Sequence, residues 1–78
     1  MTRYTFTASI WEEDGAWVAR CAELGVASAG DSADEALENL REAVALYVEN
    51  AAELGMLEEV TEPARSTHRF TSSFEIAV

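Results

Sequence analysis

The sequence contains no lysine, and all of its positive side-chain charge comes from five arginines. Aspartate and glutamate together number 15 among the 78 residues, so the formal net charge is -10 at pH 7. A surface this acidic repels phosphate, which disfavours nonspecific binding of nucleic acid and docking on anionic membranes. It favours a basic protein partner, which it attracts over about 8–10 Å at ordinary salt. The alternative that the acidity only keeps the protein soluble stays open.

The sequence also contains a single cysteine, a single histidine and no long apolar run. Cys21 is the only cysteine, which excludes an internal disulfide and a cysteine-built zinc site, and we expect a buried, inert thiol. His68 is the only histidine, and its sequence neighbours suggest no catalytic triad, so we expect a solvated side chain. Residues 1–5 lack an apolar signal core, and no apolar run reaches membrane-spanning length. We therefore expect a soluble, cytoplasmic protein.

The length is sufficient for a single domain over residues 1–78, with no separate DNA-binding domain. A domain this short buries only roughly 60–65% of the surface that its unfolded chain exposes, so its core alone gives a thin stability margin. Self-association would add stability. We therefore expect a homo-oligomer, either a dimer or a higher assembly.

Alternation of apolar and polar residues predicts a pair of strands near the N-terminus. It runs from Tyr4 to Glu12 and again from Trp17 to Ala22, and residues 13–16 between them indicate a turn. A second turn at residues 23–25 and a short third strand over residues 26–29 follow. One face of the first strand carries Tyr4, Phe6, Ala8 and Ile10, and one face of the second carries Trp17, Ala19 and Cys21, with Cys21 on the predicted core face.

A long amphipathic helix is predicted after the strands. Ser32 followed by Glu35 forms a capping box that opens it, and Gly55 is placed to end it. Its apolar stripe recurs at spacings of three and four, through Leu37, Leu40, Val44, Tyr47, Ala51 and Leu54. Residues 56–66, which include the only proline, are predicted to be a linker.

The C-terminal residues predict a last strand. Large apolar side chains alternate with mostly polar or small ones up to the final residue, at Phe70, Phe74, Ile76 and Val78. Terminal residues fray unless they are tied down, so we expect this strand to pair with its own sheet or with that of a second copy. The predicted order is β-β-β-α-β, an α+β fold in which an antiparallel sheet carries one long helix on a face.

Three short stretches of the chain form a recognisable pattern. They read Val-Ala-Arg-Cys-Ala-Glu-Leu-Gly-Val-Ala-Ser-Ala-Gly-Asp-Ser over residues 18–32, then Glu35-Ala36-Leu37, then Asn39-Leu40-Arg41-Glu42-Ala43. Together they resemble the HicB-like antitoxin domain. The resemblance covers about residues 4–50, with departures at Ala22 and Ala29, where that family often carries proline and glutamine. It implies a partial RNase-H-like fold and a module that neutralises a small basic HicA-type toxin, which cleaves messenger RNA.

An RNase-H-like fold raises the question of nuclease activity, which needs several carboxylates converging on metal ions. The candidates lie in turns and at the predicted helix start, where capping and helix-end electrostatics account for them: Glu12, Asp14, Asp31, Asp34 and Glu35. We therefore predict no enzymatic activity, no catalytic residue, no metal site and no cofactor.

The outer face of the predicted helix is the candidate partner-binding surface, through Asp34, Glu38, Glu42 and Glu49. Carboxylates four residues apart cost a helix roughly 0.2–0.5 kcal/mol per pair, and a basic partner would relieve that cost. A merely solvated acidic face explains the pattern as well. A second hypothesis, from another class, is a free-standing homo-oligomeric domain with a structural or regulatory role and no toxin. A neighbouring gene that encodes a basic protein of similar size would favour the toxin-binding module over the free-standing domain.

Overall fold

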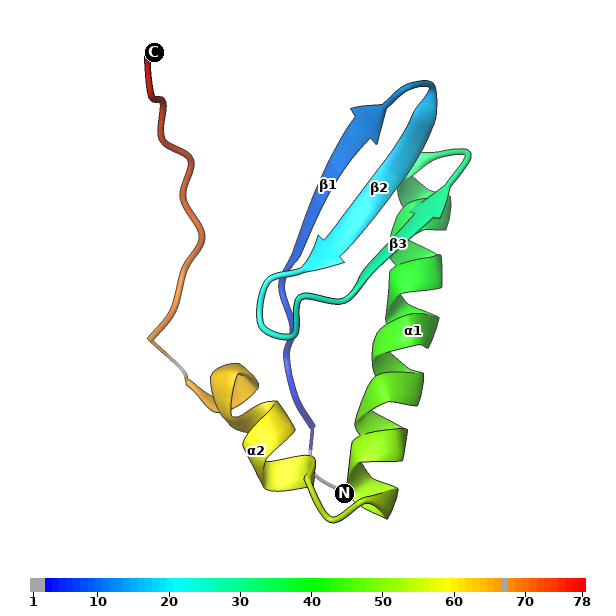
Figure 1. Cartoon of the computed structure of the whole chain (residues 1–78), viewed down its shortest axis with the longest axis vertical. Coiled ribbons are helices and arrows are strands. Elements are labelled where there is room, and N and C mark those ends of the chain that lie inside the picture. The colour runs from blue at the N-terminus through cyan, green and yellow to red at the C-terminus, as the bar shows by residue number, and fades with distance from the viewer. Residues whose placement is uncertain (1–2, 67) are drawn as a thin grey trace.

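A three-stranded antiparallel sheet packs against one side of a long helix (Figure 1). The computed structural model describes residues 3–66 and 68–78. The strands are β1 (Ala8–Glu13), β2 (Ala16–Cys21) and β3 (Ala27–Gly30), in the sheet order β1-β2-β3. Three helical elements follow: α1 (Ala33–Glu53), the short α2 (Leu57–Thr61) and the 3-10 helix η1 (Glu62–Arg65). The predicted α+β class, with one long helix on a face of an antiparallel sheet, is confirmed.

The first two strands form the hairpin that the sequence predicts. Ala8 lies opposite Cys21, and Glu13 lies opposite Ala16 at the turn. The turn itself consists of Asp14 and Gly15, both with positive φ, the backbone that lets a two-residue turn follow the twist of its strands. β1 starts four residues later than predicted, because in this register residues 4–7 would face residues 22–25, where the chain turns after β2. The Thr7 N–H donates to the Glu23 carboxylate at 2.7 Å instead.

Helix α1 begins and ends where the sequence places its signals. Ser32 is the N-cap, and its hydroxyl oxygen accepts a hydrogen bond from the Glu35 N–H at 3.1 Å. At the other end Gly55 adopts a φ of 72°, its N–H bonds to the Ala52 carbonyl, and the Met56 N–H bonds to the Ala51 carbonyl. These two bonds satisfy the last carbonyls of the helix in a Schellman motif.

The core lies between the sheet and α1. Its buried members come from β2 and from one stripe of the helix: Ala19, Cys21, Ala36, Leu40 and Val44. Partly buried side chains from the N-terminal segment, β1, β2, the loops and α1 pack around them: Phe6, Ala8, Trp17, Leu24, Val26 and Val48. Two members of the predicted apolar stripe are displaced from this core, since Tyr47 and Leu54 are exposed. Ala36 joins the core although it was not counted in the stripe.

The predicted linker is corrected by the structure. Residues 57–65 form α2 and η1, and Pro63 occupies the first turn of η1, where its missing N–H costs no hydrogen bond. These elements fold back towards the end of α1, with Thr61 and Ala64 buried along with Ala51. The Thr61 hydroxyl donates to the Leu57 carbonyl at 2.7 Å, which satisfies this buried polar side chain.

The predicted last strand is also corrected. Residues 70–78 pair with no strand among the described residues and run away from the sheet as an isolated extended segment (Figure 1). The observed order is therefore β-β-β-α, followed by two short helices. Arg69 fixes where this segment starts, because its side chain donates hydrogen bonds to the Glu23 carboxylate and to the carbonyl oxygens of Pro63 and Thr5. We attribute the lack of pairing between the segment and the sheet to this anchor.

Within the described residues, no helix combines the length and apolar character that crossing a membrane would require.

Candidate functional site

The four carboxylates predicted to bind a partner all lie on α1 and are exposed: Asp34, Glu38, Glu42 and Glu49. Their spacings of four, four and seven residues place them along one side of a helix that turns once in 3.6 residues. Glu53, four residues beyond Glu49, continues the row. The buried residues Leu40, Val44 and Ala51 lie on the opposite side. We call this row of five carboxylates the acidic face of α1.

Positive charge on α1 is limited to Arg41. Its Nε atom lies 3.9 Å from Oε2 of Glu38, and both side chains are more than 60% exposed. An exposed pair at this distance contributes little to stability, because water and salt screen it. The acidic face therefore keeps most of its negative charge available to a partner.

An exposed leucine lies within the acidic face, and the sequence analysis missed it. The Leu46 side chain is 71% exposed and lines a shallow hollow together with Ala43, Tyr47, Glu49, Asn50 and Glu53. Its neighbours one helical turn away are Glu42, Glu49 and Asn50. The signal was present in the sequence, because Leu46 falls outside the three-and-four spacing that marks the core. An apolar centre with a charged rim is typical of a protein-binding surface.

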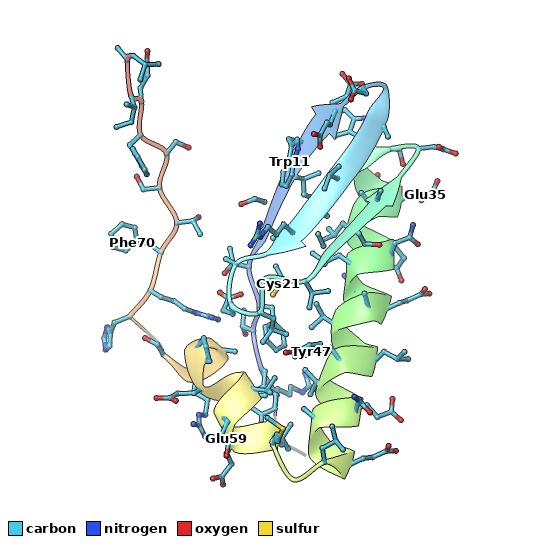
Figure 2. All side chains as sticks on the ribbon, in the orientation of Figure 1. Trp11, Cys21, Glu35, Tyr47, Glu59 and Phe70 are labelled. Atoms are coloured by element: carbon cyan, nitrogen blue, oxygen red, sulfur yellow. The ribbon has the colours of Figure 1, made fainter. Side chains whose placement is uncertain are left out.

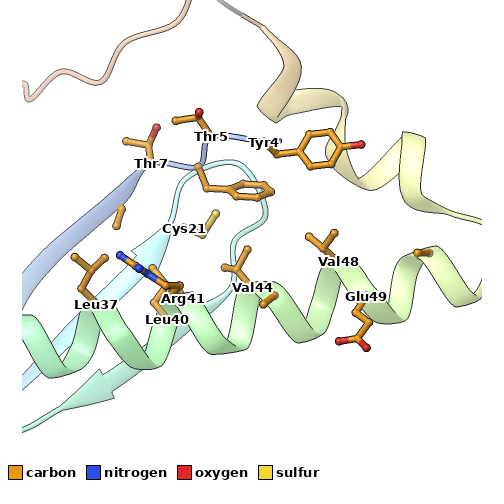
Figure 3. A pocket seen from close by; sticks show the side chains of 14 residues that line it. Tyr4, Thr5, Thr7, Cys21, Leu37, Leu40, Arg41, Val44, Val48 and Glu49 are labelled. Carbon is orange, nitrogen blue, oxygen red and sulfur yellow. The ribbon is translucent and has the colours of Figure 1, made fainter. Parts of the chain in front are cut away.

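A second surface is an open apolar groove of about 1250 Å³ between α1 and the chain that leads into β1 (Figure 3). One wall is formed by residues 4–8, the other by α1 side chains that include Leu37, Val44 and Val48, and Cys21 lies at its base. Arg41 and Glu49 are the charged side chains that line it. We call it the β1–α1 groove. The Cys21 thiol is buried, and burial raises its pKa.

The predicted oligomer strand carries the four most exposed large apolar side chains of the described residues. Phe70, Phe74, Ile76 and Val78 are each at least 72% exposed and make no contact that buries them (Figure 2). They occupy even-numbered positions, so an extended backbone carries all four on one face. The structure therefore brings the four together on one extended segment but does not place that segment against a sheet.

Glu23 links the start of that segment to the domain. Its Oε2 atom lies 2.7 Å from Nη1 of Arg69, and its side chain is only 7% exposed. Its other oxygen accepts the Thr7 N–H, while Arg69 also donates to the carbonyl oxygens of Thr5 and Pro63. Burial acts to raise the pKa of the Glu23 carboxyl, but the Thr7 hydrogen bond and the Arg69 charge outweigh it, and the pKa is lowered. Sequence reasoning missed this pair, whose members lie 46 residues apart.

The carboxylates weighed for nuclease chemistry are divided between two segments. Glu12 and Asp14 lie in or beside the β1–β2 hairpin turn, and the others lie in the segment from Asp31 to Glu35 that leads into α1. Across residues 3–66 and 68–78, no group of three or more histidine, cysteine, aspartate or glutamate side chains could hold a metal ion. His68 is exposed, as expected.

The fold and these surfaces define a small α+β domain with an acidic helix face and an apolar groove. The chain belongs to a family of unknown function, DUF7387, whose profile matches residues 6–66. The match spans every strand and helix described above and ends before the C-terminal apolar segment. Comparison with curated proteins found no match, and comparison with solved structures found none either.

Proposed function

We propose that this chain is a non-catalytic binding module whose acidic face docks on a basic protein. The observation that carries the proposal is the composition of α1, where five exposed carboxylates lie in one row and Arg41 is the only cation. Carboxylate pairs four residues apart destabilise a helix on its own, and a cationic partner would turn that cost into attraction. Leu46, exposed among the carboxylates, would supply the apolar contact that charge alone does not give.

The class of partner follows from the resemblance of residues 18–43 to HicB-like antitoxin domains. On that basis we propose that the partner is a small basic toxin that cleaves messenger RNA, and that the fold is a truncated RNase-H-like one. The chain would act in the cytoplasm, where its single buried thiol stays reduced, and would bind no nucleic acid itself. Charge steering predicts that added salt slows the association with the toxin.

The test begins with affinity capture by the tagged chain from its own cells at low salt. The captured protein is then purified and assayed for cleavage of messenger RNA, with and without one equivalent of this chain. The proposal expects a small basic ribonuclease that the chain inhibits. It fails if no basic protein is captured, or if the captured protein cleaves RNA equally well in the presence of the chain.

Matched variants locate the binding surface. Replacing Glu38, Glu42 and Glu49 by glutamine removes three charges from the acidic face, whereas the control replaces Glu12, Glu58 and Glu59, which are exposed elsewhere. Both variants lose the same net charge. The proposal expects the first to weaken inhibition at least tenfold and the control to change it less than about threefold, because close charge pairs contribute more than distant ones.

A free-standing homo-oligomeric domain with a structural or regulatory role is the second candidate. It is favoured by the exposed apolar side chains of the C-terminal segment, which a monomeric antitoxin would have no need to carry. Self-association with no captured basic partner would support this candidate over the first.

A further inference from the structure

The two edges of the sheet differ in their free backbone groups. On β3, the outward carbonyl of Ala29 accepts a hydrogen bond from the Asn39 side chain of α1 at 2.8 Å. On β1, Thr7 bonds to Ala22 of the neighbouring chain segment, so by alternation the backbone groups of Ala8, Ile10 and Glu12 point outward. Helix α1 thus covers part of the β3 edge, whereas the β1 edge is open to a further strand.

The β1–α1 groove lies beside the β1 edge. A strand added at that edge would turn the side chains of one of its faces into the groove. Residues 4–8 form one wall and α1 from Leu37 to Ala52 forms the other. This part of the helix is about 22 Å long at 1.5 Å per residue. Residues 70–78, if fully extended, span about 30 Å, which is enough to cover the whole groove.

The C-terminal segment has the pattern that such a strand needs. Its even-numbered positions carry Phe70, Phe74, Ile76 and Val78, with only Ser72 breaking the apolar row. Its odd-numbered positions are polar or small, which suits the solvent face of an edge strand. The segment carries a single charged side chain, Glu75, on that outer face, so no charge would enter the apolar groove.

The anchor at Arg69 keeps the segment away from the groove of its own chain. The guanidinium bonds to Glu23, Pro63 and the Thr5 carbonyl, so an arginine side chain separates the start of the segment from residues 5–7. In both views the segment then runs on the far side of residues 4–8 from α1, whereas the groove faces α1 (Figures 1 and 3). A second copy is free of this constraint.

We propose that two copies of this chain dimerise by exchanging their C-terminal segments. Each segment adds to β1 of the other copy and buries Phe70, Phe74, Ile76 and Val78 in the other copy's β1–α1 groove. The exchange is reciprocal, so the dimer buries the apolar surface of two segments and two grooves. The buried surface is on the order of 2000 Å² in total, because each phenylalanine buries about 150–250 Å². An area of that size is typical of stable complexes.

The first experiment measures molar mass by sedimentation equilibrium over a range of concentrations, together with two variants. The expected mass of the wild type is twice the 8.5 kDa of one chain. Phe74→Ser removes a side chain from the apolar face and should raise the dimer dissociation constant by about tenfold or more. Ala77→Ser, on the opposite face, should change it less than about twofold. A monomer at every concentration, or a dimer that Phe74→Ser leaves intact, would overturn the proposal.

The second experiment distinguishes exchange from docking within one chain. Chains carrying Ser72→Cys are mixed with tagged chains carrying Ala45→Cys, an exposed position that lines the groove, and treated with a short bismaleimide. Cys21 is 1% exposed, so wild-type mixtures give the background. We expect links between unlike chains, several-fold fewer when Ser73→Cys on the opposite face replaces Ser72→Cys. A double variant that carries both Ser72→Cys and Ala45→Cys is treated in the same way. Links within single chains of the double variant, with none between unlike chains of the mixture, would show that each segment fills its own groove and would refute the exchange.

Discussion

Glu23 joins parts of the chain that lie far apart in the sequence. Its carboxylate accepts the Thr7 N–H, which diverts that group from the sheet, and it holds Arg69 at the start of the C-terminal segment. Because the side chain is 7% exposed, these contacts are screened less than the surface pair between Arg41 and Glu38. One side chain thus binds both the chain that leads into β1 and the arginine at the start of the C-terminal segment.

Replacing Glu23 by glutamine should lower the free energy of unfolding by about 1–3 kcal/mol at pH 7, because the acceptor for Arg69 loses its negative charge and the pair becomes a weaker, neutral-acceptor hydrogen bond. The pKa of Glu23 is lowered in the folded protein, so its contribution is fully present above the unfolded pKa of about 4.3 and is lost as the pH falls from there through the lower pKa of the folded state. Urea denaturation at pH 7 and near pH 3 should therefore show the difference between wild type and variant narrowing in acid. A difference that is equal at both pH values would contradict this role.

Gly30 sits where β3 meets the first turn of α1. A Cβ atom there would lie 2.7 Å from the Ala36 backbone nitrogen and 2.9 Å from the Glu35 carbonyl carbon, which cannot move aside cheaply. Gly30→Ala should therefore destabilise the fold by about 1–3 kcal/mol, as overpacking does. The neighbouring Ala29→Ser, on an exposed position, should stay within about 0.5 kcal/mol. Thermal unfolding of both variants is the measurement. If Gly30→Ala is as stable as Ala29→Ser, β3 and α1 can move apart to admit the methyl group and the close approach at Gly30 is not required.

Among the elements, those with local signals could be predicted from the sequence. The Asp14–Gly15 turn, the Ser32 cap and the Gly55 stop each lie within a few residues of the structure they determine. The sequence predicts a linker in place of the α2–η1 segment because residues 56–66 contain the only proline, Pro63. Its apolar spacing through Leu57, Val60 and Ala64 was present but too short to stand out, and packing near the end of α1 stabilises it.

The candidate binding surfaces likewise differ in whether local sequence signals could predict them. The acidic face could be predicted because its residues belong to one helix and follow the helical period. The β1–α1 groove and the Glu23–Arg69 pair could not, because each is formed by segments far apart in the sequence. The C-terminal strand was predicted from a valid alternation, but a strand needs a partner edge, and the contacts of Arg69 direct the segment away from its own.

Helix α1 also offers a test of whether its acidity serves binding rather than stability. Glu42→Gln removes the repulsion with Glu38, one turn earlier, and should raise the free energy of unfolding by about 0.2–0.5 kcal/mol. If the proposed function holds, the same change should also weaken inhibition of the captured basic protein. Glu75→Gln, which lies outside the folded elements, is the control and should change neither quantity. Urea denaturation gives the first quantity and the RNA-cleavage assay the second; a destabilised Glu42→Gln chain would contradict the repulsion argument.

At the scale of the whole molecule, the acidic face of α1 and the β1–α1 groove can be occupied at the same time. Exchange of the C-terminal segments would use the β1 edge and the groove, whereas Asp34, Glu38, Glu42 and Glu53 lie outside the groove lining. Glu49 borders both surfaces. A dimer would therefore present two acidic faces, and we expect one basic partner per chain, measurable as the molar mass of the assembled complex.

The most direct test of the central claim is RNA cleavage by the captured basic protein in the presence of one equivalent of this chain. The account predicts that the wild type and the Glu12, Glu58 and Glu59 control suppress cleavage, while the triple glutamine variant at Glu38, Glu42 and Glu49 suppresses it at least tenfold less well. Equal suppression by both variants would contradict a role for the acidic face. Undiminished cleavage with the wild type would contradict the proposed function itself.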